Sequence, residues 1–90
     1  MQPFSPSMQL NALKPGQSAI IDGIQAEQAL VQRLNALGFR AGKQVQVVRQ
    51  AAFNGPLHIR IGSTDVVIRL QDAQAIYLLT PLTDPESTSA

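Results

Sequence analysis

Two short segments in the second half of the chain alternate apolar and polar residues with a period of two. The apolar residues of segments 57–61 and 65–70 are Leu57, Ile59, Ile61, Val66, Ile68 and Leu70. Successive side chains of a β-strand point to opposite faces, so this alternation is typical of strands with one buried side. The intervening Gly62-Ser63-Thr64 favours a turn. The pattern therefore predicts two strands joined by a turn.

Three further segments have the composition of strands, and one has the period of a helix. Residues 18–24, 44–49 and 76–80 are rich in Ile, Val and Leu, and Gly23 predicts a bulge in the first of them. In residues 26–37 the apolar side chains recur at spacings of three and four, which is the helical period. The chain is therefore expected to be mainly β with one helix, forming a small bent barrel of about five strands plugged by the helix.

Two pairs of residues are expected to set the ends of elements. Gly38 follows the helical segment and is predicted to adopt a positive φ, and Phe39 would then pack against Leu34, as in a Schellman helix end. Gly55 and Pro56 close a loop at residues 51–56 that contains an Asn-Gly turn signal.

Length and composition restrict the class of protein. The chain has 90 residues and a formal net charge of +1, and only 14% of its residues are charged. One domain is expected at residues 9–82, after a flexible lead at residues 1–8 and before a disordered tail at residues 83–90. The sequence shows neither a membrane-spanning run nor a secretory signal pattern, so a cytoplasmic protein that does not insert into the membrane is expected.

Catalytic and metal-binding patterns are missing from the sequence. There is no cysteine and only one histidine, His58, and the carboxylates are scattered without a catalytic pair. The glycines form no phosphate-binding fingerprint. We therefore expect no enzyme activity, no cofactor and no metal site. Asp65 could approach His58 across a hairpin, but a solvent-exposed histidine is the favoured interpretation.

Several motifs occur in one order along residues 9–80, and together they are specific although each alone is weak. They are Leu10-x-x-Leu13-Lys14-Pro15-Gly16, the helix end Arg33-Leu34-Asn35-Ala36-Leu37-Gly38-Phe39, Gly42 before Val45-Gln46-Val47-Val48, Gly55-Pro56-Leu57 with Ile59, and Ile68-Arg69-Leu70 with Ala73 and Ile76. This order resembles the FeoA family of bacterial ferrous iron uptake. The resemblance implies an SH3-like β-barrel and a partner, the membrane iron transporter FeoB with its cytoplasmic GTP-binding domain. Iron-dependent repressors carry a C-terminal domain similar to this family.

A protein without catalytic groups must act by contact, so the outward-facing residues are the candidate partner-binding surface. The alternation sends apolar, aromatic and arginine side chains outward: Val48, Arg60, Val67, Arg69, Tyr77 and Leu79. An ordinary solvated sheet face is the competing interpretation. Phe53, in the 51–56 loop, is either a second anchor or folded back onto the barrel.

Two functions follow from these observations. The first is a regulator that binds the cytoplasmic region of FeoB. The second is a nucleic-acid-binding barrel, which the low net charge and the four aromatic residues disfavour. We expect no nucleic-acid partner, and the sequence leaves the oligomeric state open.

Overall fold

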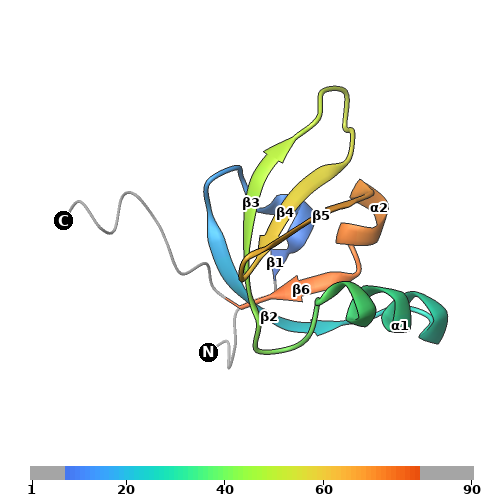
Figure 1. Ribbon diagram of the computed structural model, residues 1–90. Helices are drawn as coiled ribbons and strands as arrows, with labels where there is room; N and C mark the ends of the chain where they lie inside the picture. The colour runs from blue at the N-terminus through green and yellow to red at the C-terminus, as the bar shows by residue number, and fades with distance from the viewer. Residues whose placement is uncertain (1–7, 80–90) are drawn as a thin grey trace, which may run out of the picture.

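The computed structural model describes residues 8–79, which form a curved sheet with a helix at one end (Figure 1). The strands are β1 (Met8–Gln9), β2 (Ser18–Ile24), β3 (Gln44–Gln50), β4 (Leu57–Ile61), β5 (Thr64–Ile68) and β6 (Ile76–Leu78). The helices are the 3-10 turn η1 (Leu10–Ala12), α1 (Gln28–Leu37) and α2 (Leu70–Ala73).

The sheet has six antiparallel strands in the order β1-β6-β2-β3-β4-β5, and its two edges, β1 and β5, do not pair. The expectation of a mainly β fold with one main helix is confirmed, but a closed barrel of about five strands is wrong. The added strand, β1, has two residues, too few to give a periodic pattern. The chain then leaves the sheet at Leu10, which is fully buried in η1. The sheet therefore curls without closing.

The central hairpin follows the predicted alternation. Leu57, Ile59 and Ile61 are buried on β4, and Ile68 is buried on β5. The second strand ends at Ile68, so its predicted extension to Leu70 is wrong. Leu70 instead begins α2, where a spacing of three places it on the same side as the fully buried Ala73. The alternation thus stops where the helical spacing takes over.

Helix α1 begins at Gln28, two residues later than predicted, and ends at Leu37 as predicted. Gly38 has φ 112°, its N–H donates to the Asn35 carbonyl, and the N–H of Phe39 donates to the Leu34 carbonyl. This is the predicted Schellman end, and Phe39 and Leu34 are both buried.

The helix covers one end of the sheet and does not fill a barrel. Leu34 is its one buried side chain within the core cluster, and Leu30 packs against that cluster. Ala29 is exposed, and Leu37 is 39% exposed. The apolar stripe of α1 is therefore only partly covered.

Two bulges bend the sheet. The register of β2 against β6 shifts between Ile21 and Gly23, which confirms the predicted bulge. The register of β3 against β4 shifts between Val47 and Arg49, so Val48 lies in a second bulge. Bulges increase local twist, which helps the sheet to curl.

Only the predicted start of the domain, residue 9, lies within the described residues, because the predicted end at residue 82 lies beyond them. Strand β1 begins at Met8, one residue before the predicted domain start. The rest of the predicted lead, and the whole of the predicted tail at 83–90, lie outside the described residues. Within residues 8–79, no helix is long and apolar enough to cross a membrane.

Candidate interaction surface

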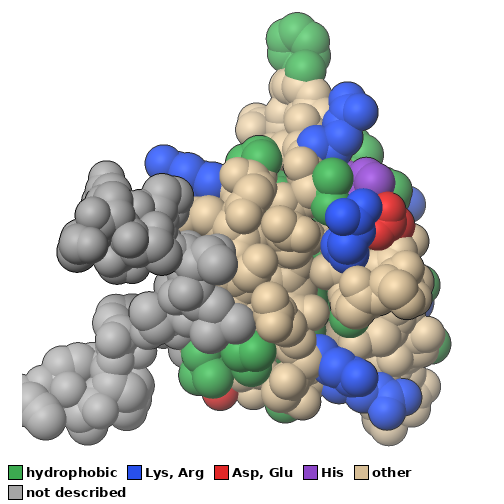
Figure 2. Space-filling model, turned by 60° about the vertical axis from the view of Figure 1, so that its left-hand side comes forward, with side chains coloured by type: hydrophobic (Ala, Val, Ile, Leu, Met, Phe, Trp, Pro, Cys, Tyr) green, Lys and Arg blue, Asp and Glu red, His purple; other side chains and the backbone are tan. Residues whose placement is uncertain are grey.

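The outward side chains of the central hairpin form one continuous face of the sheet. Cross-strand pairing sets Arg60 opposite Asp65 and His58 opposite Val67. Directly opposite residues in an antiparallel pair lie side by side on the same face. This outer face therefore combines two basic side chains, a carboxylate and an exposed valine, and Figure 2 shows the imidazole, arginine and carboxylate side chains together.

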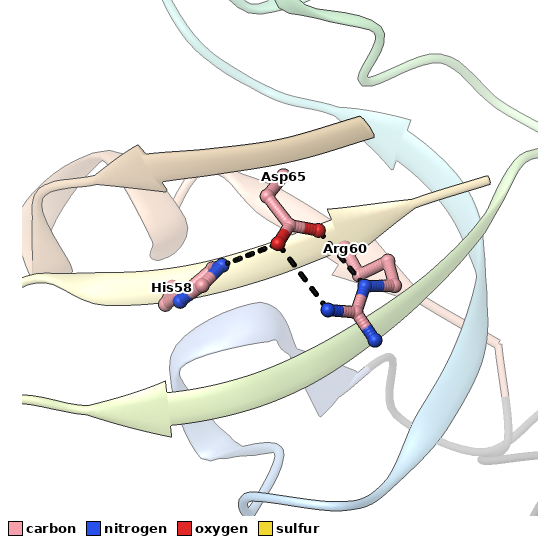
Figure 3. Close-up of polar contacts among 3 residues, drawn as sticks. All are labelled: His58, Arg60 and Asp65. Atoms are coloured by element: carbon pink, nitrogen blue, oxygen red, sulfur yellow. Dashed lines mark hydrogen bonds and ion pairs between the residues drawn. The ribbon is translucent and has the colours of Figure 1, made fainter. Parts of the chain in front are cut away.

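Asp65 lies between the two basic side chains, as Figure 3 shows. Arg60 donates from Nε to Asp65 Oδ1 at 2.8 Å and from Nη2 to Asp65 Oδ2 at 3.2 Å. His58 Nε2 is shielded from solvent and lies 3.0 Å from Asp65 Oδ2, an ion-pair distance without well-aligned hydrogen-bond geometry. The predicted approach of Asp65 to His58 is therefore present, whereas the pairing of Asp65 with Arg60 was not predicted from the sequence.

The hydrogen bonds from Arg60, followed by the contact with His58, lower the pKa of Asp65 from 3.8 to about 2. The same hydrogen bonds and charge raise the pKa of Arg60 above its ordinary value. Because both side chains are substantially exposed to water, the pair contributes little to stability and chiefly fixes the orientation of Arg60.

A groove of about 350 Å³ lies between the last turn of α1 and the junction of β5 with α2. Its apolar lining consists of Leu34, Leu37, Val67 and Ile68. Its polar lining consists of Arg33, Arg69 and Asp72. Val67 is 65% exposed and Leu37 is 39% exposed, so apolar surface in this groove faces solvent.

Of the two arginines that line the groove, one is paired with a carboxylate and the other makes no ion pair within residues 8–79. Arg33 Nη2 lies 3.5 Å from Asp72 Oδ2, an ion pair that joins α1 to α2. Arg69 is exposed and makes no ion pair within residues 8–79. The groove therefore has an apolar lining beside an uncompensated positive charge.

The structure does not bring all six predicted surface residues together. Val67 and Arg69 line the groove, and Arg60 lies on the same sheet face as Val67. Tyr77 lies on β6, which β2 and β3 separate from β4 in the sheet order. Leu79 follows β6 directly and is 49% exposed. Arg60, Val67 and Arg69 are therefore one group, and Tyr77 and Leu79 are another.

Val48, the remaining predicted residue, lies at the margin of this surface, and two residues that were not predicted line the groove. Val48 is half-buried in the β3 bulge, next to the strand that carries Arg60. Arg33 and Leu37 line the groove but were not among the predicted surface residues, although both lie in the helical segment. Leu37 is the last residue of the apolar stripe before Gly38, and Arg33 lies one helical turn before it.

The loop between β3 and β4 projects beyond the rest of the sheet (Figure 1). Phe53 is at its tip and is 100% exposed, so the alternative of folding back onto the barrel is wrong. Figure 2 shows a hydrophobic group at this tip. The Gly55 N–H donates to the carbonyls of Ala51 and Ala52, and a Cβ on Gly55 would lie 2.6 Å from the Ala51 Cβ. Glycine is therefore required at 55 to close the turn that holds Phe53 outward.

Metal-ligating side chains do not gather in the described part of the chain. Residues 8–79 contain no group of three or more His, Asp or Glu side chains placed to hold a metal ion. His58 and Asp65 are the two that meet, and Arg60 already binds the carboxylate. What this surface presents to solvent is the apolar surface of Val67 and Leu37 and the cation of Arg69.

Comparison with known sequences places this chain in a family. A family model described as the FeoA domain matches residues 8–79. A Campylobacter jejuni protein named "Putative Fe(2+) transport protein A" is 32% identical over 69 residues, which are 77% of this chain and 93% of the relative. These matches link the family to ferrous iron transport.

Solved structures share the fold. FeoA from Stenotrophomonas maltophilia, solved with zinc and described as a prokaryotic SH3 domain protein, is 29% identical, with a TM-score of 0.70 over 79% of this chain and 88% of that chain. A manganese-dependent transcriptional repressor, 24% identical, has a TM-score of 0.77, and the match covers 87% of this chain but 44% of the repressor. Since the family model spans all the described strands and helices, this chain belongs to the FeoA family.

Proposed function

We propose that this chain is a cytoplasmic, non-enzymatic accessory protein of ferrous iron uptake that acts by binding the cytoplasmic region of the membrane transporter FeoB. Membership of the FeoA family supports the link to ferrous iron. The contact role rests on the groove, where Val67 and Leu37 expose apolar surface beside the unpaired Arg69. The buried core of a protein interface is more apolar than the rest of the surface, and arginine is enriched there.

The exposed Phe53 loop is the second contact in this proposal. An aromatic side chain that touches nothing in its own fold is available to enter an apolar recess on a partner. Tyr77 and Leu79 lie on a separate part of the sheet, so the proposed binding surface consists of Arg60, Val67, Arg69 and Phe53, with Val48 at its margin.

The nucleic-acid alternative has less support. The likeness to a transcriptional repressor is below 25% identity and concerns less than half of the repressor chain, so it reports the fold alone. On the outer face Arg60 is engaged by Asp65, which leaves few free cations to track a phosphate backbone.

The proposal is tested by measuring the affinity of the full chain for the cytoplasmic region of FeoB, with and without guanine nucleotide. Arg69→Glu and Val67→Asp should each weaken binding by about tenfold or more, because each removes a central interface side chain. Arg60→Glu should also weaken it, provided that circular dichroism shows an intact fold. Lys14→Glu makes the same charge change at an exposed position that does not line the groove, and should bind like the wild type. No binding by the wild-type chain in either nucleotide state would reject the proposal.

A further inference from the structure

Strand β5 is an edge of the sheet, hydrogen-bonded on one side only (Figure 1). Its register with β4 is regular from Ile61↔Thr64 to Leu57↔Ile68, and Gly62 and Ser63 form the turn. In a hairpin with a two-residue turn, the flanking pair is hydrogen-bonded and the pairs then alternate. The backbone N–H and C=O groups of Asp65 and Val67 therefore point away from β4.

These outward groups have no backbone partner within residues 8–79. The hydrogen bonds from turns and loops in the described chain do not reach Asp65 or Val67, and both residues are exposed. Proteins usually protect an edge strand with charged side chains, especially lysine, with a proline or with a bulge. The one charged side chain of β5, Asp65, is bound by Arg60 on the neighbouring strand, and β5 has no lysine, proline or bulge. The opposite edge, β1, is only two residues long. The free edge of β5 is therefore a template on which a further strand can form.

The groove lies beside this free edge, because Val67 belongs to both. Leu37 and Val67 provide apolar surface for one side chain of an incoming strand. Arg69 supplies a positive charge that no described side chain compensates, whereas Arg33 forms an ion pair with Asp72. Charge complementarity therefore favours a segment that carries a carboxylate close to an apolar residue.

We propose that β5 binds an extended segment of the FeoB cytoplasmic region by strand addition, with an apolar side chain in the groove and a carboxylate on Arg69. Main-chain hydrogen bonds to Asp65 and Val67 would hold the segment, and the groove would select its side chains. This inference rests on the proposed function and adds the mode of recognition to it.

Amide hydrogen exchange of the full chain, followed by NMR with and without the FeoB cytoplasmic region, tests the backbone contact directly. In the free protein the Asp65 and Val67 amides should exchange fast, while the Val66 and Ile68 amides, bonded to β4, exchange slowly. Adding the FeoB region should slow the exchange of the Asp65 and Val67 amides by about tenfold or more. Protection that appears without FeoB, and rises with protein concentration, would assign the edge to a second copy of this chain and overturn the proposal.

A matched pair of variants separates the backbone from the side chain. Val67→Ala removes most of the side chain but keeps the N–H, whereas Val67→Pro also removes the outward N–H without breaking a bond to β4. Val67→Pro should bind FeoB at least about tenfold more weakly than Val67→Ala. If Val67→Pro fails to fold, the exchange measurement decides alone.

The outcomes distinguish the two proposals. Two results would reject strand addition and leave the proposed function standing. In the first, the wild-type chain binds the FeoB region but the Asp65 and Val67 amides remain unprotected. In the second, the proline and alanine variants of Val67 bind the FeoB region with equal affinity. No binding to the wild-type chain would reject both.

Discussion

Phe53 is the residue whose conformation the fold explains least. It has φ 60° and its neighbour Asn54 has φ 59°, so both central residues of the loop turn are left-handed, as in a type I′ turn. A bulky side chain in this region is an outlier that costs about 1–2 kcal/mol. Because Phe53 is 100% exposed, no packing in the described chain offsets that strain. The strain therefore fits the proposal that Phe53 contacts a partner.

Phe53→Asn is therefore expected to change two properties, the stability of the fold and the affinity for FeoB. Asparagine tolerates positive φ better, so the free energy of unfolding should rise by about 0.5–1 kcal/mol. Binding to the FeoB cytoplasmic region should weaken, because the exposed ring is lost. Urea denaturation and a binding titration measure the two effects. A variant that is less stable, or that binds FeoB with unchanged affinity, would show that the phenylalanine serves the fold.

Gly38 is a residue whose backbone alone dictates its identity. With φ 112° it requires glycine, although a Cβ there would have room, 3.6 Å from the nearest atom of Ile61. Gly38→Val should therefore lower the free energy of unfolding by more than about 1 kcal/mol through backbone strain, and Gly38→Ala by less. Chemical denaturation tests this, and an unchanged midpoint for the valine variant would contradict it.

At both positions, prediction from sequence depended on whether a local rule exists. The conformation of Gly38 and Phe39 follows from the neighbouring sequence, because a glycine after a helical stripe has one common conformation. Both expectations are confirmed. The orientation of Phe53 does not follow from the neighbouring sequence. An apolar loop residue can fold back onto the sheet or project from it, and only the tertiary structure determines which.

At the scale of elements, the β4–β5 hairpin could be predicted because its alternation has a single interpretation. The register then implies that Arg60 faces Asp65, a pairing that a turn of known length would have supplied. Strand β1 could not be predicted, since two residues carry no period. Leu70 was misplaced because its spacing fits both a continued strand and the start of α2.

The Arg60–Asp65 pair of the same hairpin makes the stability of the fold depend on pH. The pKa of Asp65 is lowered to about 2, below its ordinary value of 3.8, so the Arg60–Asp65 pair favours the folded state fully above pH 3.8. That contribution is lost as the pH falls toward 2. Carboxyl NMR titration of the folded protein should find the lowered pKa, and Arg60→Gln should raise it toward 3.8. Arg69→Gln, which removes an arginine that is not paired with Asp65, is the control. A pKa of 3.8 in the wild type would contradict the pairing.

At the scale of the whole molecule, the groove could not be read from the sequence. Its lining comes from α1, from β5 and α2 and from Arg69 between them, and α1 lies far from these segments in the sequence. The alternation places Val67 and Arg69 outward but does not determine which residues of other elements lie beside them. Their predicted grouping with Tyr77 and Leu79 does not hold, because three strands separate β6 from β5 in the sheet order.

The molecule as a whole is also expected to bind ferrous iron weakly on its own. The one histidine already contacts Asp65, and residues 8–79 bring no third metal-ligating side chain to that pair. Anaerobic calorimetry of the full chain with Fe²⁺ should show weak heats, and His58→Ala should leave cellular iron uptake nearly unchanged. A stoichiometric site of micromolar or better affinity would contradict this expectation.

The most direct test of contact through the β5 groove is ferrous iron uptake in cells that lack this chain and are complemented with single variants. Wild-type protein and Lys14→Glu should restore uptake. Val67→Asp and Arg69→Glu should fail to restore it although they fold and accumulate to the same level. Full restoration by both groove variants would contradict a function exercised through this surface.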